Sequence, residues 1–286
     1  MSVDQHGVSA QHAADCWQTG RVNSLVPDAP RAQKIMSSDG LQLATYDFGD
    51  ADAPTVLAVH GFASSALVNW HATGWTRDLT RAGYRVIALD QRGHGESDKP
   101  HDPSAYSMEQ LVADLVVVMD TYLIDEAVYA GYSLGARVGW QAALDLPGRI
   151  TRAVLGGIPD GQPLTRLRTN EARAFIETGA EVEDRITRAY VTMASAIPGN
   201  DLEALMSLVD GMRDGIQPDP SHPPLQPVLF ATGSDDAILE RSRSLSEATP
   251  NGVFYEIPGR NHFNAPTSRH FRTAAIEFLR AQTHGM

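Results

Sequence analysis

The sequence is almost without cysteine. Its one cysteine, Cys16, has no partner for an internal disulfide, and a cysteine-based metal site needs more than one thiol. We therefore expect a protein of the reducing cytoplasm. The chain also has no stretch of about eighteen consecutive apolar residues and no basic start followed by an apolar segment. We expect neither a membrane span nor an export signal.

Positive charge is scarce as well. The 23 Lys and Arg stand against 35 Asp and Glu, which gives a net charge of −12 and a pI near 5.2. Because phosphate binding depends on clustered Lys and Arg, this balance argues against nucleic acids and anionic membrane surfaces as partners. No group of His and carboxylates has metal-site spacing, and no glycine-rich loop has the residues of a phosphate site, so we expect no metal or other cofactor.

The apolar residues, at 42% of the chain, are sufficient for a large core. After a hairpin within residues 32–48, short apolar runs alternate with helical patterns, which is typical of a parallel sheet covered by helices on both faces. The expected strands are 55–60, 84–90, 127–132, 152–157, 227–233 and 252–257, and the expected helices are 74–82, 107–122, 134–145, 238–247 and 267–281. The predicted fold class is α/β, whose ligands bind at the carboxyl ends of the strands.

The alternation stops once, between residues 158 and 226, where only helical patterns occur. One helical face combines Ile186, Tyr190, Met193 and Ile197, and another combines Leu202, Leu205, Leu208, Val209 and Met212. We interpret 158–226 as a helical cap inserted into a core made of 29–157 and 227–286. Residues 1–28 show no periodicity and are expected to form an arm.

Residues 131–135 have the pattern G-x-S-x-G, and they lie where the expected strand 127–132 meets the next helix. A chain that turns directly from a strand into a helix needs a strained backbone and small residues on each side of the bend. Gly131 and Gly135 meet that need, so Ser133 is the candidate nucleophile. The alternative role, a helix N-cap, explains the serine but not the two glycines.

A serine hydroxyl needs a base, normally a histidine that a carboxylate holds in one tautomer. Of the histidines after Ser133, His262 is best placed, because it follows the last expected strand at the carboxyl edge of the sheet. Asp235 and Asp236 follow the preceding strand at the same edge. The order Ser, Asp, His along the chain is the one expected for a nucleophile in this kind of bend.

Five motifs occur in order along the chain: HGF at 60–62, DQRGHGESDKP at 90–100, GYSLG at 131–135, GSDD at 233–236 and GRNHF at 259–263. Through them the chain resembles the α/β-hydrolase fold family, from about Ala32 to Arg280, as a member with a serine nucleophile and a short cap. The resemblance implies a mostly parallel eight-stranded sheet with helices on both faces and a helical cap.

The resemblance also assigns roles. In that family the acid usually lies three positions after the glycine that closes its strand, which favours Asp236 over Asp235, whereas a minority of members would use the position of Asp160. The backbone N–H groups of Phe62 and Leu134 would form the oxyanion hole, the pair of donors that stabilises a developing negative oxygen.

Three polar residues of the same loops, His60, Arg92 and His94, are interpreted as structural braces, because polar groups in turns mostly serve the structure. The substrate pocket is expected to be apolar. Its expected contributors are Phe62, Trp70, Tyr132, Leu134 and Phe263, together with some of Met193, Met206 and Met212, although the core of the cap is the preferred role for these three methionines.

Together, the motifs and the resemblance predict a serine esterase that cleaves small to medium apolar carboxylic esters through an acyl-enzyme, as a monomer or homodimer. Carbon–carbon bond hydrolysis of vinylogous diketo acids stays open, although members with that chemistry tend to have more glycines than HGFASS and SLGAR contain. A ligand receptor with incidental hydrolysis also stays open. Ser133 disfavours epoxide hydrolysis and dehalogenation, for which the family uses aspartate at that position.

Overall fold

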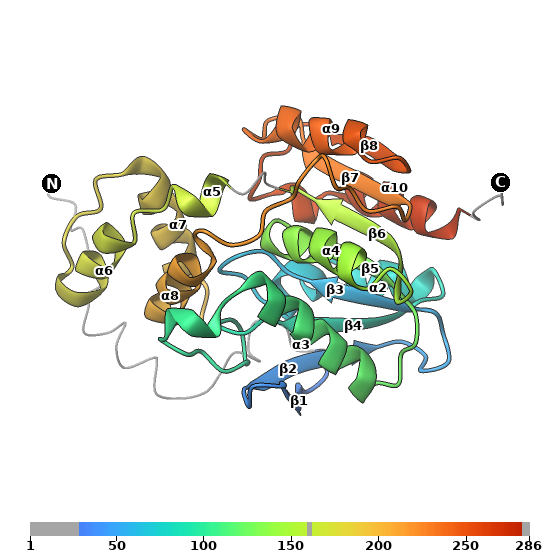
Figure 1. The fold of residues 1–286 in the computed structure, drawn as a ribbon, viewed down its shortest axis with the longest axis horizontal. Coiled ribbons are helices and arrows are strands. Elements are labelled where there is room, and N and C mark those ends of the chain that lie inside the picture. The colour runs from blue at the N-terminus through green and yellow to red at the C-terminus, as the bar shows by residue number, and fades with distance from the viewer. Residues whose placement is uncertain (1–28, 159–161, 282–286) are drawn as a thin grey trace, which may run out of the picture.

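The apolar runs form one sheet of eight strands in the order β1-β2-β4-β3-β5-β6-β7-β8 (Figure 1). The computed structural model describes residues 29–158 and 162–281. The strands are β1 (Gln33–Met36), β2 (Gln42–Phe48), β3 (Thr55–Val59), β4 (Arg85–Asp90), β5 (Ala127–Tyr132), β6 (Ile150–Gly156), β7 (Val228–Gly233) and β8 (Gly252–Ile257). β2 pairs antiparallel with β1 and β4, and all other pairs are parallel. The predicted fold class is confirmed, while the expected arm at 1–28 lies outside the described residues.

The strand order reverses at β3, because β4 lies on one side of it and β5 on the other. In a parallel sheet such a reversal leaves a crevice outside the carboxyl ends of the strands, since the loops that follow them diverge. The loop after β3 begins at His60, and the turn after β5 contains Ser133. The topology therefore brings these two segments of the sequence together at one edge of the sheet.

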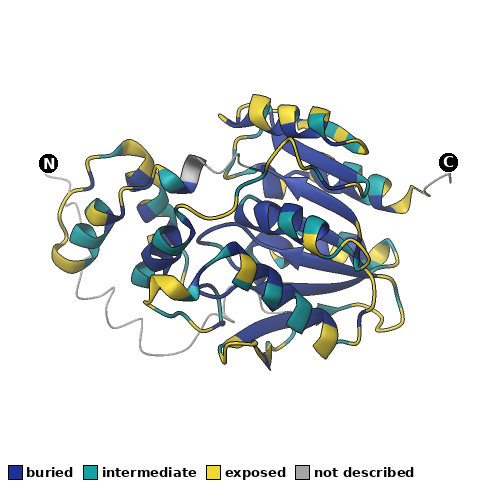
Figure 2. Ribbon diagram, in the orientation of Figure 1, coloured by how far each residue is buried: buried dark blue, intermediate teal, exposed yellow. Residues whose placement is uncertain are grey.

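Helices cover both faces of the sheet, as the alternating pattern predicts. The core helices are α2 (Trp75–Arg81), α3 (Met108–Thr121), α4 (Leu134–Asp145), α9 (Leu239–Ala248) and α10 (Arg269–Arg280), each within two residues of its expected bounds. Apolar side chains of α3, α4 and α9 pack in one core, and those of α2 and α10 pack in a second core on the opposite face. Figure 2 shows the strands dark blue between these layers, with exposed residues on the outer sides of the helices.

Four further helices follow β6: α5 (Gln162–Thr165), α6 (Thr169–Thr178), α7 (Arg185–Ala196) and α8 (Leu202–Met212). No strand occurs from 162 to 227, so the predicted helical insertion is confirmed, although only the faces of α7 and α8 were recognised in the sequence. We call residues 162–226 the cap. The division into core and cap at residues 158 and 226 stays a prediction. Among the described residues, no helix has the length and apolar character needed to cross a membrane.

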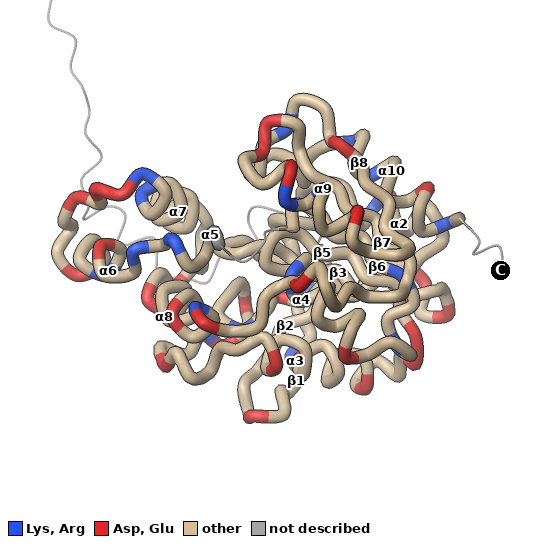
Figure 3. Tube along the Cα trace, turned by 45° about the horizontal axis from the view of Figure 1, so that its top comes forward, with Lys and Arg blue, Asp and Glu red and all other residues tan. Residues whose placement is uncertain are grey.

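Ion pairs hold the cap together internally. Arg173 of α6 pairs with Glu203 and Asp210 of α8, with nitrogen–oxygen distances of 2.8 and 2.6 Å. Figure 3 shows Lys and Arg interspersed with Asp and Glu along these helices. The cap is attached to the core where α8 crosses the 3₁₀ segment η4 (Pro103–Ala105). A Cβ on Gly211 would lie 2.1 Å from the Pro103 carbonyl oxygen, so only glycine permits this close packing.

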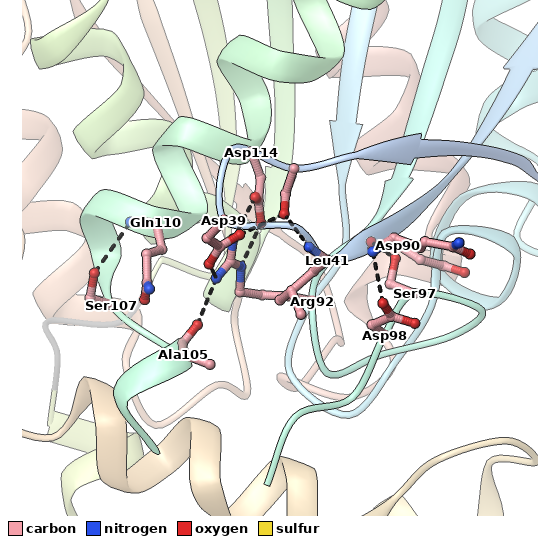
Figure 4. A network of polar contacts seen from close by, with 12 residues as sticks. Asp39, Leu41, Asp90, Arg92, Ser97, Asp98, Ala105, Ser107, Gln110 and Asp114 are labelled. Carbon is pink, nitrogen blue, oxygen red and sulfur yellow. Dashed lines mark hydrogen bonds and ion pairs between the residues drawn. The ribbon is translucent and has the colours of Figure 1, made fainter. Parts of the chain in front are cut away.

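The loop after β4 is organised by a buried arginine (Figure 4). The Arg92 guanidinium is fully buried and forms two hydrogen bonds to the Asp114 carboxylate, at 2.8 and 2.7 Å. It also binds Asp39 at 2.7 Å and the Ala105 carbonyl oxygen at 2.7 Å. These bonds join the β1–β2 turn, the β4 loop and α3, which is the bracing that the sequence suggested for Arg92.

Replacing Asp114 should therefore be costly. Burial is the largest influence on the Asp114 carboxyl and raises its pKa, while the Arg92 guanidinium opposes this by stabilising the charged form. We expect Asp114→Asn to lower the free energy of unfolding by about 3 kcal/mol, because it leaves the buried Arg92 guanidinium with the exposed Asp39 as its charged partner. Urea denaturation measures this. Glu126→Gln, at an exposed position, is the control, and equal stability of the two variants would refute the argument.

Candidate active site

The turn between β5 and α4 has the strained geometry that its glycines predict. Ser133 has φ 53° and ψ −110°, a conformation that residues other than glycine rarely adopt. A Cβ on Gly131 would lie 2.4 Å from the Gly135 oxygen, and a Cβ on Gly135 would lie 2.1 Å from the Val59 oxygen. The bend is thus pressed against the neighbouring strand β3, and both glycines are sterically required.

The backbone N–H groups around the bend are used unequally. The N–H of Ser133 donates to the Gly156 oxygen at 2.8 Å, and that of Gly135 donates to the His60 oxygen at 3.1 Å. The Leu134 N–H, the first of helix α4, has no acceptor in the described part of the chain. A free N–H at a helix N-terminus, where the helix dipole is positive, can bind a negatively charged oxygen.

A histidine and a carboxylate meet the serine. His262 Nε2 lies 2.9 Å from Ser133 Oγ, and His262 Nδ1 lies 2.8 Å from Asp236 Oδ2. A carboxylate only accepts, so Nδ1 donates to Asp236 and Nε2 is left to accept the serine proton. The other carboxylate oxygen accepts the Ile238 N–H at 3.1 Å, which orients the largely buried Asp236 side chain.

The other acid candidates are not brought to this histidine. Asp235 is exposed, and its Oδ1 accepts from Ser234 Oγ at 3.0 Å. Asp160 lies outside the described residues. Of the aspartates considered from the sequence, Asp236 is therefore the one in contact with His262 in the described chain.

Tyr132, expected only as a pocket residue, also anchors the histidine loop. Its buried hydroxyl donates to the His262 backbone oxygen at 2.5 Å, and the two rings lie 5.5 Å apart. Because Tyr132 directly precedes Ser133, one peptide segment positions both the hydroxyl and the imidazole. Its partner is a backbone carbonyl, which every residue has, so the sequence could not predict this contact.

The loop after β3 is held by hydrogen bonds on both sides of one peptide group. The Gly61 oxygen accepts from His60 Nδ1 at 2.8 Å and from the Ser64 N–H at 3.2 Å. In a trans peptide the next N–H, that of Phe62, points the opposite way. Within the described residues that N–H has no acceptor. The Gln91 N–H donates to His60 Nε2 at 3.1 Å, which fixes the tautomer as Nδ1–H.

A second buried imidazole holds the same loop. His94 Nε2 accepts the Ala63 N–H at 3.0 Å, and its Nδ1 donates to the Arg92 oxygen at 3.1 Å. Ala63 has φ 57°, a strained value, and its oxygen accepts from the cap residue Asn200 at 2.9 Å. Burial lowers the pKa of His60 and, more strongly, that of His94, so both rings are neutral and each can accept a hydrogen bond from a backbone N–H.

A pocket of about 300 Å³ opens beside Ser133 and His262. Phe62, Tyr132 and Phe263 line it as predicted, together with Met193 from the cap. The cap residue Tyr190 also lines it, with its ring 5.9 Å from those of Phe62 and Phe263. Burial raises the pKa of Tyr190 to about 12, so its hydroxyl stays protonated at neutral pH. In the described chain, no group of three or more His, Cys, Asp or Glu could hold a metal ion.

Two residues expected in the pocket, Trp70 and Leu134, do not line it, whereas Met206 and Met212 have the core role that was preferred for them. Trp70 is 1% exposed and packs on Trp75, with ring centroids 5.2 Å apart, in the core on the opposite side of the sheet. The Leu134 side chain and the cap residues Met206 and Met212 are buried in the other core. Apolar character alone does not distinguish a residue of a pocket wall from a residue of the core, and these side chains belong to the core.

One lining residue, Asn69, was missed by the sequence analysis. It lies in a short π-helical segment, η3 (Leu67–His71), that was not expected. The signal that could have identified it is a single amide within the apolar sequence LVNW, close to the HGF motif.

The comparisons with known proteins agree with this architecture. Residues 54–175 match the family model of the α/β-hydrolase fold. An esterase from Thermogutta terrifontis superposes with a TM-score of 0.71 over 88% of this chain and 98% of that chain, at 24% identity. The chain has the α/β-hydrolase fold.

Curated relatives of this chain carry more than one name. Epoxide hydrolase A of Mycobacterium tuberculosis is 33% identical over 143 residues, which are 50% of this chain and 42% of that protein. A putative 2-succinyl-6-hydroxy-2,4-cyclohexadiene-1-carboxylate synthase of Bacillus subtilis is 32% identical over 170 residues, 57% of this chain and 58% of that protein. The chain thus spans about half the length of these curated relatives.

The glycines of the bend give a direct test of the α/β-hydrolase turn. We expect Gly135→Ala to lower the free energy of unfolding by about 2 kcal/mol or more, because its Cβ would overlap the Val59 oxygen. Gly148→Ala is the matched control, since nothing lies within 4 Å of a Cβ there. Chemical denaturation of both variants measures the difference. If Gly135→Ala is as stable as the control, the bend is not pressed against β3.

The neutral histidines predict how stability depends on pH. Below about pH 6.5, His94 binds a proton in the unfolded chain but not in the folded chain, where burial lowers its pKa. The contribution of neutral His94 to stability is therefore fully present above that pH and declines as the pH falls. The slope is about 1.4 kcal/mol per pH unit for each such group. Between pH 7 and 5.5, His94→Gln should lose less stability than wild type, by about 1 kcal/mol. The exposed His270→Gln should follow the wild type, and identical slopes in all three proteins would contradict the prediction.

Proposed function

We propose that this protein is a serine hydrolase that cleaves carboxylic esters through an acyl-enzyme intermediate. The observation that carries the proposal is the chain of contacts from Ser133 Oγ through His262 to Asp236, at 2.9 and 2.8 Å. These are the distances needed for a base to take the proton of a nucleophile while a carboxylate holds that base.

The reaction begins when His262 Nε2 takes the Ser133 proton as Oγ forms a bond to the ester carbonyl carbon. The carbonyl electrons move to oxygen, and the N–H groups of Phe62 and Leu134 bind the resulting oxyanion. The intermediate collapses, the carbon–oxygen bond to the alcohol breaks, and His262 gives its proton to the departing alcohol. Asp236 stabilises the imidazolium while it lasts.

Water completes the cycle. It attacks the acyl-enzyme carbonyl while His262 Nε2 takes one of its protons, and a second tetrahedral oxyanion forms in the same hole. The collapse of that intermediate releases the carboxylic acid and returns the proton to Ser133. No cofactor is needed, because the two proton transfers balance within each half of the reaction.

Epoxide opening is the second candidate, because several relatives carry that name. The nucleophile argues against it. A carboxylate that opens an epoxide forms an ester, which water can hydrolyse, whereas the hydroxyl of Ser133 would form an ether. An ether has no carbonyl to accept water, and the enzyme would be blocked after one turnover.

The pocket supports a small apolar substrate. Phe62, Tyr190, Met193 and Phe263 form much of its wall, and its volume of about 300 Å³ lies at the lower end of the range for ligand pockets. A carbon–carbon bond hydrolase would use the same three residues, so that reaction is distinguished by its substrates. A receptor would bind such ligands without turnover.

The test is a series of aryl esters of increasing acyl length, a small epoxide and a vinylogous diketo acid. We expect the wild type to prefer the short esters and Ser133→Ala to lose at least about 10⁴-fold in kcat, because it removes the nucleophile. Asp236→Asn should lose less than Ser133→Ala, and Asp235→Asn should retain activity. Product formation measured by absorbance or chromatography provides the rates.

Circular dichroism of each variant controls for folding. Faster turnover of the diketo acid than of any ester would replace the proposal by carbon–carbon cleavage, and epoxide turnover that survives Ser133→Ala would replace it by epoxide hydrolysis. Tight binding without turnover of any substrate would favour the receptor.

A further inference from the structure

One buried amide in the pocket wall has an unused donor. Asn69 is 5% exposed and lines the pocket that holds Ser133. Its Nδ2 has no acceptor among the described residues. Some other buried polar atoms also lack partners, but Asn69 is the residue of this kind found in the pocket wall. A buried donor that remains unpaired destabilises the fold, so its presence requires an explanation.

The orientation of this amide is fixed by its surroundings. Asn69 Oδ1 accepts the Gly61 N–H at 3.4 Å, and rotating the amide by half a turn would place two donors against each other. The backbone is fixed as well, because the Asn69 N–H donates to the Ser65 oxygen at 2.9 Å and its carbonyl accepts from Thr73 Oγ1 at 2.6 Å. Nδ2 is therefore the one hydrogen-bonding group of this residue left for a ligand.

The amide also lies close to the reacting atoms. Gly61, to which Asn69 is bonded, directly precedes the proposed oxyanion donor Phe62, and a Cβ on Gly61 would lie 3.3 Å from Ser133 Cβ. From these contacts we expect an acceptor that reaches Nδ2 from a bound ester to lie near the scissile carbonyl. Val68 and Ile197 line the same pocket with apolar side chains, and the lining hydroxyls of Thr73 and Thr267 already donate to backbone carbonyls.

From these contacts we infer that Asn69 selects acyl substrates with a second oxygen, a carbonyl or hydroxyl oxygen, close to the ester carbonyl, by donating a hydrogen bond from Nδ2. The inference rests on the proposed ester hydrolysis and names its substrate class: esters of short oxo or hydroxy acids. A site built around a buried donor discriminates against analogues that leave the donor unpaired.

The test compares two phenyl esters of nearly equal shape, the 3-oxobutanoate and the 3-methylbutanoate, in which a methyl group replaces the second oxygen. The ratio of their kcat/KM values is measured in wild type and in Asn69→Leu, so that differences in intrinsic reactivity cancel. We expect the preference for the oxo ester to fall by about ten- to a hundred-fold in the variant. Asn170→Leu, at an exposed cap position, should leave the ratio unchanged.

A binding measurement separates this inference from the proposed function. In Ser133→Ala the intact esters bind without reaction, and calorimetry should give tighter binding of the oxo ester, an advantage that is lost in Ser133→Ala/Asn69→Leu. If the wild type hydrolyses neither ester, the proposed function fails, and the binding preference still tests Asn69.

Two results would overturn the inference. An equal loss of activity on both esters in Asn69→Leu would mean that Asn69 acts only through the Gly61 loop or as a further oxyanion donor. An unchanged ratio with unchanged activity on both esters would mean that Nδ2 does not contact the substrate. If Asn69→Leu does not fold, Asn69→Asp serves instead, because it keeps an oxygen for the Gly61 N–H and lacks the donor, and the same selective loss is expected.

Discussion

The site depends on the strained bend at Ser133. Its positive φ costs about 1 to 3 kcal/mol and persists only where the surrounding structure enforces it. Here the enforcement is steric, because the backbone of Gly131 lies against that of Gly135, and Gly135 in turn lies against the Val59 carbonyl of β3. The bend therefore displays the hydroxyl, frees the Leu134 N–H and brings α4 against the strand whose loop carries the second proposed oxyanion donor.

That second loop is held by two buried imidazoles, one from the loop itself and one from the loop after β4. Two neutral imidazoles, His60 and His94, each use one nitrogen as donor and the other as acceptor, and together they fix the carbonyl of Gly61 and the N–H of Ala63. The cap residue Asn200 holds the Ala63 carbonyl. Donors fixed in this way need no reorganisation when charge develops, which is what makes them effective in water-poor sites. Burial maintains the neutral state on which the arrangement depends.

How much of the fold and of the site could be predicted depends on how many residues each sequence pattern spans. Periodicity predicts strands and helices because it repeats over many residues, and the bend at Ser133 is predicted by a pattern of two glycines that spans five positions. The contact of His262 with Asp236 joins two loops whose common edge is dictated by the sheet. The direction of a side chain in a single turn is not encoded in this way, so Trp70 was assigned to the pocket and its neighbour Asn69 was overlooked.

The errors at Trp70 and Asn69 concern the pocket wall and not the residues proposed to carry the chemistry. The proposed chemistry uses groups at the ends of strands, which the sheet positions, whereas part of the pocket wall comes from the η3 segment and the cap helix α7. Tyr190 of α7 reaches Phe62 and Phe263, while Asn69 of η3 binds the Gly61 N–H. Both segments thus contact the loops of the proposed reaction, although neither segment contains one of the five sequence motifs. A change in either can alter which substrate fits while the strained bend and its partners stay in place, which is consistent with relatives that share this fold and differ in the reaction they are named for.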